Sequence, residues 1–156
     1  IGGGLIQPVS HSIIPPFPLL RLISLNTRGM NDYMRKLMTL NEILPHKPTV
    51  VLLQETKIKE SEIPNFIRSW NGPTVWSSTQ SSSKGVITLF QKDSLVESLS
   101  IHDEGRYTIS SLLWHSFTII IVNVYAPNLL NEQQPFFHEL HLILLDIIKP
   151  SDILIV

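Results

Sequence analysis

The sequence predicts an α/β layered sandwich, in which mixed β-sheets are covered by helices on their outer faces. Residues 20–56 predict a strand, a helix and a second strand, an order that gives a parallel pair with a right-handed crossover. Residues 74–125 predict several antiparallel strands, two of them in a hairpin. A long amphipathic helix over residues 131–148 and a final apolar strand follow. This order of elements is typical of layered sheets with helices outside.

The composition fits one domain, or a large piece of one, in a chain of 156 residues. Hydrophobic residues make up 43% of the chain, which indicates a packed core and excludes global disorder. The net charge is −1, so the chain lacks the basic character of many nucleic-acid-binding proteins, although a few local contacts and a metal ion can serve such a partner. The absence of cysteine excludes disulfides and cysteine-based zinc sites. No apolar run is long enough to predict a membrane-spanning helix.

Two strands and a helix are predicted in the first part of the chain. Residues 1–19 hold three glycines and four prolines, which indicates a flexible or extended lead-in before a domain over residues 20–156. Residues 20–26 alternate as a strand does. Asn31 is placed to cap a helix that runs to about Leu44, just before a proline.

The most informative stretch is the apolar run from Thr49 to Leu53, which continues through Gln54 to Glu55. An unbroken apolar run bounded by turn signals predicts a buried strand. In open α/β sheets, ligands bind at the carboxyl ends of strands. A buried carboxylate is costly unless it is paired or bound to a metal. Glu55 is therefore either a metal-binding acid or a surface acid that pairs with Lys57.

The remaining elements follow in a simple order. They are a weak helix at 61–70, strands at 74–76, 85–90 and 95–101, a hairpin of 106–114 and 117–125, the long helix at 131–148 and a strand at 153–156. The long helix has a wide apolar stripe that includes Phe136, Leu140 and Leu144, and we expect this stripe to pack on a sheet.

Three predicted strands end in polar residues that can handle phosphate or metal, namely Asn26, Glu55, and Tyr125 with Asn128 close behind it. Simpler interpretations exist for each. Asn26 can form an Asx-turn after its strand, and Tyr125 can be an ordinary strand aromatic. Arg106, near the start of the hairpin, can pair with the acid at position 104.

Five short motifs carry a resemblance to a known family. They are Ser24–Gly29 (SLNTRG), Leu53–Thr56 (LQET), Lys84–Val86 (KGV), Glu104–Tyr107 (EGRY) and Asn123–Asn128 (NVYAPN). In this order and spacing they resemble the endonuclease/exonuclease/phosphatase superfamily, and within it the endonuclease domain of non-LTR (LINE-type) retrotransposons. The resemblance covers the chain from about Leu20 to its end. It implies a four-layer α/β sandwich, here partial and truncated before its second half is complete, that corresponds to about the N-terminal two thirds of the domain.

The resemblance also implies a role for each strand-end residue. Glu55 is implied to bind a catalytic Mg²⁺ or Mn²⁺, since Mg²⁺ prefers one or two carboxylates together with waters and phosphate oxygens. Asn26 is implied to support the metal site and the scissile phosphate, and Tyr125 to offer its hydroxyl to a phosphate oxygen. Asn128 is implied to bind the DNA backbone, and Arg106 to support the site or contact phosphate.

Two features depart from the family pattern. Arg28 stands where some relatives carry an acid, which removes a possible second carboxylate and favours the LINE-type branch over abasic-site repair enzymes. The later Gly-Asp-x-Asn and Ser-Asp-His motifs are missing, and we expect both ends of the sequence to be cuts in a longer protein. We therefore expect the chain as given to be inactive. We also expect it to contain one sheet and the beginning of another, with an apolar face left exposed that favours association.

In the complete domain, the resemblance implies a metal-dependent endonuclease that nicks target DNA for retrotransposition. Its implied partner is DNA and not a membrane, its polypeptide is implied to continue into a reverse transcriptase, and its implied location is the nucleus. Two alternatives stay open. One is another hydrolase of the superfamily, either an abasic-site repair nuclease or an inositol or lipid phosphatase. The other is a non-catalytic remnant of a decayed retroelement with at most a binding role.

Overall fold

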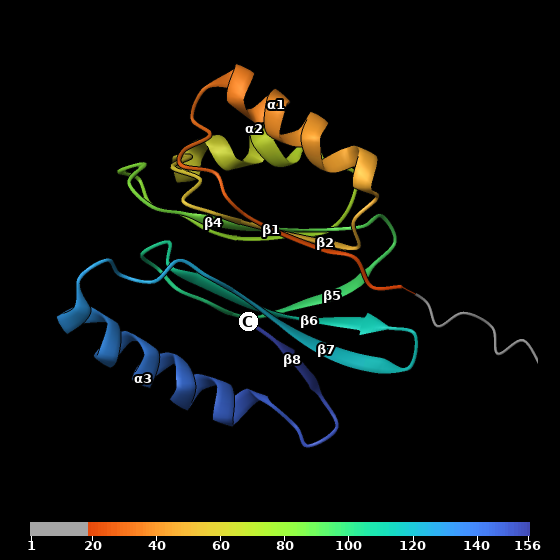
Figure 1. Ribbon diagram of the computed structural model, residues 1–156, viewed down its shortest axis with the longest axis vertical. Helices are drawn as coiled ribbons and strands as arrows, with labels where there is room; N and C mark the ends of the chain where they lie inside the picture. Colours follow the sequence, from red (N-terminus) through yellow and green to blue (C-terminus); the bar gives the residue numbers. More distant parts are fainter. Residues whose placement is uncertain (1–18) are drawn as a thin grey trace, which may run out of the picture.

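The structure is a computed structural model that describes residues 19–156, so the lead-in expected at residues 1–19 lies outside the described residues apart from Leu19. Two four-stranded sheets pack face to face, and helices cover the outer face of each sheet (Figure 1). The predicted sandwich of mixed sheets with helices outside is confirmed. Within the described residues, no helix is long and apolar enough to cross a membrane.

The first sheet has the strand order β1-β2-β4-β3. Its strands are β1 (Leu22–Asn26), β2 (Val50–Gln54), β3 (Thr74–Ser77) and β4 (Val86–Phe90). β1 and β2 run parallel in a register that places Asn26 opposite Gln54, and β4 is antiparallel to both β2 and β3. β2 is almost fully buried because it lies between β1 and β4 with packed layers on both faces. The predicted β-α-β unit is therefore present, and Glu55 follows its buried second strand.

The second sheet has the strand order β5-β6-β7-β8. Its strands are β5 (Leu95–Ile101), β6 (Tyr107–Trp114), β7 (Phe117–Val124) and β8 (Ile153–Ile155). The β6–β7 hairpin turns at His115 and Ser116 as predicted, and β8 adds to β7 in parallel. We expected only the beginning of a second sheet. In the described residues, the second sheet has four strands, the same number as the first.

Helices lie on both outer faces of the sandwich (Figure 1). They are α1 (Tyr33–Ile43) with the 3₁₀ turn η1 (Leu44–His46), the 3₁₀ turn η2 (Glu60–Glu62) with α2 (Ile63–Ile67), and α3 (Leu130–Ile147). The cap of α1 differs from the prediction. The carboxylate of Asp32, not the side chain of Asn31, accepts a hydrogen bond from the backbone N–H of Met34 at 3.3 Å. An acid at this position also complements the positive end of the helix dipole.

Three apolar layers hold the sandwich together. The first lies between the first sheet and helices α1 and α2, the second between the two sheets, and the third between the second sheet and α3. Buried members of these layers, in that order, are Leu53 and Phe66, Phe90 and Ile121, and Ile109 and Leu140. The inner faces of the two sheets therefore cover each other, and the exposed sheet face that we expected is not present in the described residues.

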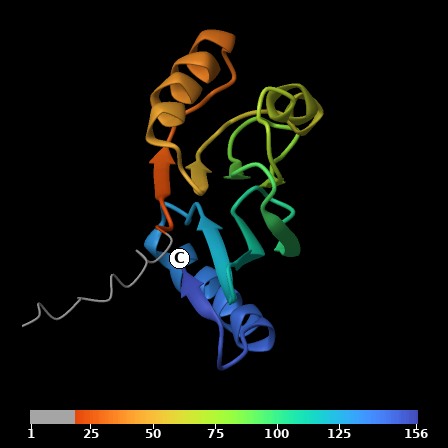
Figure 2. The same cartoon turned by 90° about the vertical axis from the view of Figure 1, so that its right-hand side faces the viewer.

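Both sheets are open on the same side of the molecule. β1 and β8 are the end strands of their sheets, and they lie on one side of the sandwich (Figure 2). Leu22 on β1 is 39% exposed and Leu154 on β8 is 42% exposed. The strands at these edges carry backbone groups that can pair with a further strand. Apolar side chains are thus exposed at these sheet edges, and others are exposed on the helices, for example Met38 on α1 and Leu145 on α3.

Candidate active site

The carboxyl ends of β1, β2 and β7 leave the sandwich at the same end. Asn26 is the last residue of β1, Glu55 follows β2 directly, and the parallel register sets these two strand ends side by side. Tyr125 follows the last residue of β7. A hydrogen bond links the two sheets near these strand ends, from Gln54 Nε2 on β2 to Asn123 Oδ1 on β7 at 2.8 Å. The structure therefore brings Asn26, Glu55 and Tyr125 to one edge of the sandwich.

Backbone hydrogen bonds continue from loop to loop beyond the strand ends. Across the site they run from Thr27 N to Gln54 O (2.9 Å), Gly29 N to Glu55 O (2.8 Å), Thr56 N to Gly85 O (3.0 Å), Gly85 N to Gly105 O (3.2 Å) and Tyr125 N to Arg106 O (2.7 Å). Gly85 has a φ of +131°, and a Cβ there would clash with the hydroxyl of Thr56. The candidate side chains therefore project from loops that share one hydrogen-bonded framework.

Glu55 carries the only carboxylate among the three strand-end residues. Its backbone has a φ of +52°, a conformation uncommon for residues other than glycine. Its Oε1 lies 2.9 Å from Lys57 Nζ, and its side chain is 19% exposed. The hydrogen bond from Lys57 lowers the pKa of Glu55 against the opposing effect of desolvation, and the Asn26 amide and the charge of Arg28 lower the pKa further. The pair with Lys57 that we considered from the sequence is present, and it keeps a charged carboxylate at the strand end.

Asn26 forms the Asx-turn that the sequence left open as one interpretation. Its Oδ1 accepts a hydrogen bond from the backbone N–H of Arg28 at 3.0 Å, which is an Asx-turn. Its side-chain amide also contributes to the lowered pKa of the Glu55 carboxyl. The turn sets the course of the loop after β1, and the same amide lies beside the strand-end acid.

Arg106 holds the loop that carries Tyr125. Its guanidinium donates to the carbonyl oxygens of Tyr125 and Ala126, at 3.3 Å and 3.1 Å, and its Cζ lies 5.3 Å from the centroid of the Tyr125 ring. Such a contact is a cation–π interaction. Glu104, the alternative partner of Arg106, pairs instead with Lys84 at 3.2 Å. The geometry makes Arg106 a positioning residue for Tyr125.

Asn128 lies apart from this framework. It is exposed in the loop between β7 and α3, and its side chain makes no hydrogen bond to the described residues. Its position three residues beyond Tyr125 keeps it at the same end of the sandwich.

Asn123 is the residue of this region whose role the sequence did not predict. It is 1% exposed. Besides accepting from Gln54, its amide donates to Leu53 O at 3.2 Å, Ile87 O at 3.1 Å and Thr88 Oγ1 at 3.2 Å. This set of bonds ties β7 to the two central strands of the first sheet. The signal in the sequence was a single amide within an otherwise apolar, β-branched strand.

The donor set fits a weakly held Mg²⁺ or Mn²⁺ ion at Glu55. Within residues 19–156, no three His, Cys, Asp or Glu side chains gather as a metal cluster, so such an ion would rest on one carboxylate. Mg²⁺ accepts this arrangement, since it keeps several waters and shares phosphate oxygens with a substrate. The lowered pKa of Glu55 leaves that carboxylate charged at neutral pH. The Oδ1 of Asn26 is engaged by Arg28 N, so Asn26 fits a supporting role rather than that of a direct ligand.

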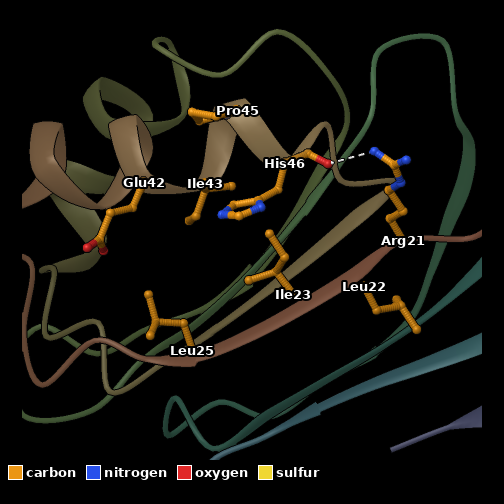
Figure 3. A pocket seen from close by; sticks show the side chains of 8 residues that line it. All are labelled: Arg21, Leu22, Ile23, Leu25, Glu42, Ile43, Pro45 and His46. Atoms are coloured by element: carbon orange, nitrogen blue, oxygen red, sulfur yellow. Dashed lines mark hydrogen bonds between the residues drawn. The ribbon is translucent and has the colours of Figure 1, made fainter.

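A cleft of about 720 Å³ lies away from the candidate residues. Figure 3 shows it between β1 and the C-terminal end of α1, where Ile23, Leu25 and Ile43 line its wall. Arg21 donates a hydrogen bond to the carbonyl oxygen of His46 at one end of the cleft, at 3.2 Å. None of the five residues predicted from the sequence to form the site lines this cleft.

Comparison with known proteins identifies the fold. No family model and no curated protein matches the sequence. Among solved structures, the endonuclease domain of TRAS1, a telomere-specific non-LTR retrotransposon, matches with a TM-score of 0.61 at 12% identity, over 87% of this chain and 57% of that one. The chain has the endonuclease/exonuclease/phosphatase fold.

Two further structures with the endonuclease/exonuclease/phosphatase fold give the same result. Truncated TDP2 from Caenorhabditis elegans matches with a TM-score of 0.63 at 16% identity, over 86% of this chain and 59% of that one. An AP endonuclease from Archaeoglobus fulgidus matches with a TM-score of 0.58 at 16% identity, over 84% and 53%. The chain thus spans little more than half the length of these structures. At such identities the likeness concerns the fold, and the activities of those proteins do not follow from it.

Proposed function

We propose that the chain is part of a metal-dependent DNA endonuclease domain that hydrolyses phosphodiester bonds. The observation that carries this proposal is the convergence of Asn26, Glu55 and Tyr125 at neighbouring strand ends, on loops joined by backbone hydrogen bonds. Two solved structures with this fold are named as endonucleases, which supports a nuclease over a phosphatase. The likeness to a retrotransposon domain supports the finer proposal that the complete domain nicks target DNA for retrotransposition.

Each residue has a defined part in the proposed reaction. Glu55 would hold the divalent cation, Mg²⁺ or Mn²⁺, which when bound neutralises charge on the phosphate. Tyr125 would donate its hydroxyl proton in a hydrogen bond to a non-bridging phosphate oxygen, from a position fixed in advance by Arg106. Asn26 holds the loop after β1 in its turn and adds its amide next to the acid. Asn128, exposed beyond Tyr125, would contact the DNA backbone.

The proposal extends to the protein that contains this domain. Its polypeptide would continue into a reverse transcriptase and act in the nucleus on chromosomal DNA. Sequencing the transcript beyond Val156 tests this extension. A Gly-Asp-x-Asn motif directly after β8, with reverse transcriptase sequence further on, is the expected result, and an immediate stop codon would contradict it.

Metal binding tests the proposal at the level of this chain. Titration of the chain with Mn²⁺, followed by the electron paramagnetic resonance signal of free Mn²⁺, should give binding that Glu55→Gln weakens at least about tenfold, because the variant removes the charged ligand. Glu97→Gln is the matched control, since Glu97 is exposed on β5 away from the strand ends. If Glu55→Gln and Glu97→Gln bind Mn²⁺ equally well, Glu55 is not the ligand and the proposal fails.

A further inference from the structure

Arg28 is held close to Glu55 by the backbone of the loop after β1. Its φ is +52°, and its N–H donates to Asn26 Oδ1 at 3.0 Å. The next residue, Gly29, has a φ of +102° and donates its N–H to the carbonyl oxygen of Glu55 at 2.8 Å. These two hydrogen bonds fix the backbone of Arg28, because its own N–H is bonded to Asn26 and the N–H of the next residue is bonded to Glu55.

The guanidinium of Arg28 has no protein partner in residues 19–156. It donates no hydrogen bond and has no carboxylate within 4.0 Å, and its side chain is exposed. Its charge nevertheless acts on Glu55, where it contributes to the lowered pKa of that carboxyl. The other arginines near the sheets differ, because Arg21 and Arg106 both donate to backbone carbonyls.

Two cationic side chains, Lys57 and Arg28, lie around Glu55, and this charge favours the approach of an anionic ligand. Lys57 already binds Glu55 Oε1, and its aliphatic stem packs on Gly29, where an added Cβ would lie 3.4 Å from Lys57 Cδ. Lys57 is the salt-bridge partner of Glu55, whereas Arg28 forms no salt bridge with the described residues. On its other side Arg28 lines a cleft of about 590 Å³ between the loop after β1 and helix α1, together with Arg35 and Glu42 of that helix.

We propose that Arg28 binds the DNA phosphate at the Glu55 edge, so that its guanidinium contacts the non-bridging oxygens of that phosphate. This inference rests on the proposed function and names a further substrate-binding residue for it. A guanidinium presents two parallel N–H donors that match two phosphate oxygens, and it stays charged at any working pH. The divalent cation at Glu55 would be the first positive charge on the phosphate. Arg28 would add a second positive charge, which does not depend on the metal.

Salt-dependent DNA binding tests this role without any need for turnover. The full chain is titrated into a fluorescein-labelled DNA duplex in EDTA, at salt concentrations from about 50 to about 200 mM, and binding is followed by fluorescence anisotropy. Arg28→Asn removes the charge, and asparagine tolerates a positive φ better than most residues. Arg28→Lys keeps the charge, and Arg68→Asn is the matched control because Arg68 is exposed at the end of α2 without a salt bridge.

Loss of one phosphate contact should lower the slope of log K against log salt by about one and weaken binding roughly tenfold at about 50 mM salt. We expect this for Arg28→Asn, with a slope close to that of the wild type for both Arg28→Lys and Arg68→Asn. If Arg28→Asn behaves as Arg68→Asn does, the inference is wrong while the proposed function stands. If the wild-type chain shows no salt-dependent binding, the inference is wrong, and the proposed function is judged separately by the Mn²⁺ titration of Glu55. Circular dichroism checks that Arg28→Asn is folded, and Arg28→Gly replaces it if it is not, because glycine accepts the same φ freely.

Discussion

The amide of Asn123 should contribute much of the stability of the contact between the two sheets at the site. Asn123→Ala removes four hydrogen bonds, one accepted from Gln54 and three donated to Leu53 O, Ile87 O and Thr88 Oγ1. Each bond is worth about 1 kcal/mol net, and buried partners left without a bond add to the loss. Because the three donated bonds share two hydrogens, and Gln54 Nε2 keeps a second acceptor in Leu52 O, we expect a loss of about 2–4 kcal/mol.

Urea denaturation followed by tryptophan fluorescence measures this loss as a shift in the midpoint at constant m-value. Asn128→Ala is the control, since an exposed asparagine without hydrogen bonds should change the free energy of unfolding by no more than about 0.5 kcal/mol. A double-mutant cycle with Gln54→Ala should give a coupling energy of about 0.5–3 kcal/mol. If Asn123→Ala is no more destabilising than the control, the amide does not join the sheets in the way described.

Three other predictions concern the helix cap, the acid and the sheet edge. Asp32→Ala should lower the free energy of unfolding by about 1 kcal/mol in a urea titration, and Asn31→Ala should leave it nearly unchanged; equal effects would contradict the assignment of the cap. Because the pKa of Glu55 is lowered from its ordinary 4.5 in the folded chain, the stability it provides is present above that pH and is lost as the pH falls through the folded-state pKa. Lys57→Met should therefore raise the midpoint of the Glu55 carboxyl in an NMR titration, and an unchanged midpoint would show that the pair is not formed. Leu154→Lys should reduce any concentration-dependent association seen by light scattering, because a charge on an edge strand opposes strand pairing, whereas association that persists unchanged would place the contact elsewhere.

The local elements of the fold could be predicted because their signals are local. The apolar run that forms β2 and the β-branched run that forms β7 each end within one or two residues of the predicted bounds. Two adjacent capping residues precede α1, and only the backbone conformation distinguishes them, since Asp32 is extended with φ −92° and ψ 136° and bonds Met34 N. A pattern of side chains alone cannot make that distinction.

The arrangement of the strands into two four-stranded sheets was harder to predict because it depends on contacts between distant segments. β8 pairs with β7 only after α3 has crossed the outer face of the second sheet, so a short apolar run at the end of the sequence gives no sign of its partner. The bond between Gln54 and Asn123 joins residues 69 positions apart. The side-chain amides of Gln54 and Asn123 are partners because the inner faces of the two sheets pack against each other.

The candidate site was predictable as a set of residues but not as a set of contacts. The strand-end positions of Asn26, Glu55 and Tyr125 follow from the strand pattern, and their grouping follows from the fold. The partner of Arg106 could not be assigned from the sequence. Glu104, two residues away, was the nearer choice, whereas in the structure the guanidinium of Arg106 donates to the Tyr125 loop. Tyr125 lies opposite Arg106 at the open end of the β6–β7 hairpin, so spacing along a single strand does not assign this contact.

Paramagnetic broadening by Mn²⁺ tests most directly whether the three strand ends form one metal-dependent site. In a ¹H–¹⁵N NMR spectrum of the chain, a substoichiometric amount of Mn²⁺ should broaden the backbone amide signals of Asn26, Glu55 and Tyr125 together. It should spare the amide of His115 in the hairpin turn at the opposite end of β7, and Glu55→Gln should abolish the effect. Broadening centred on any other part of the chain, or broadening at Glu55 without Tyr125, would contradict the existence of a shared site.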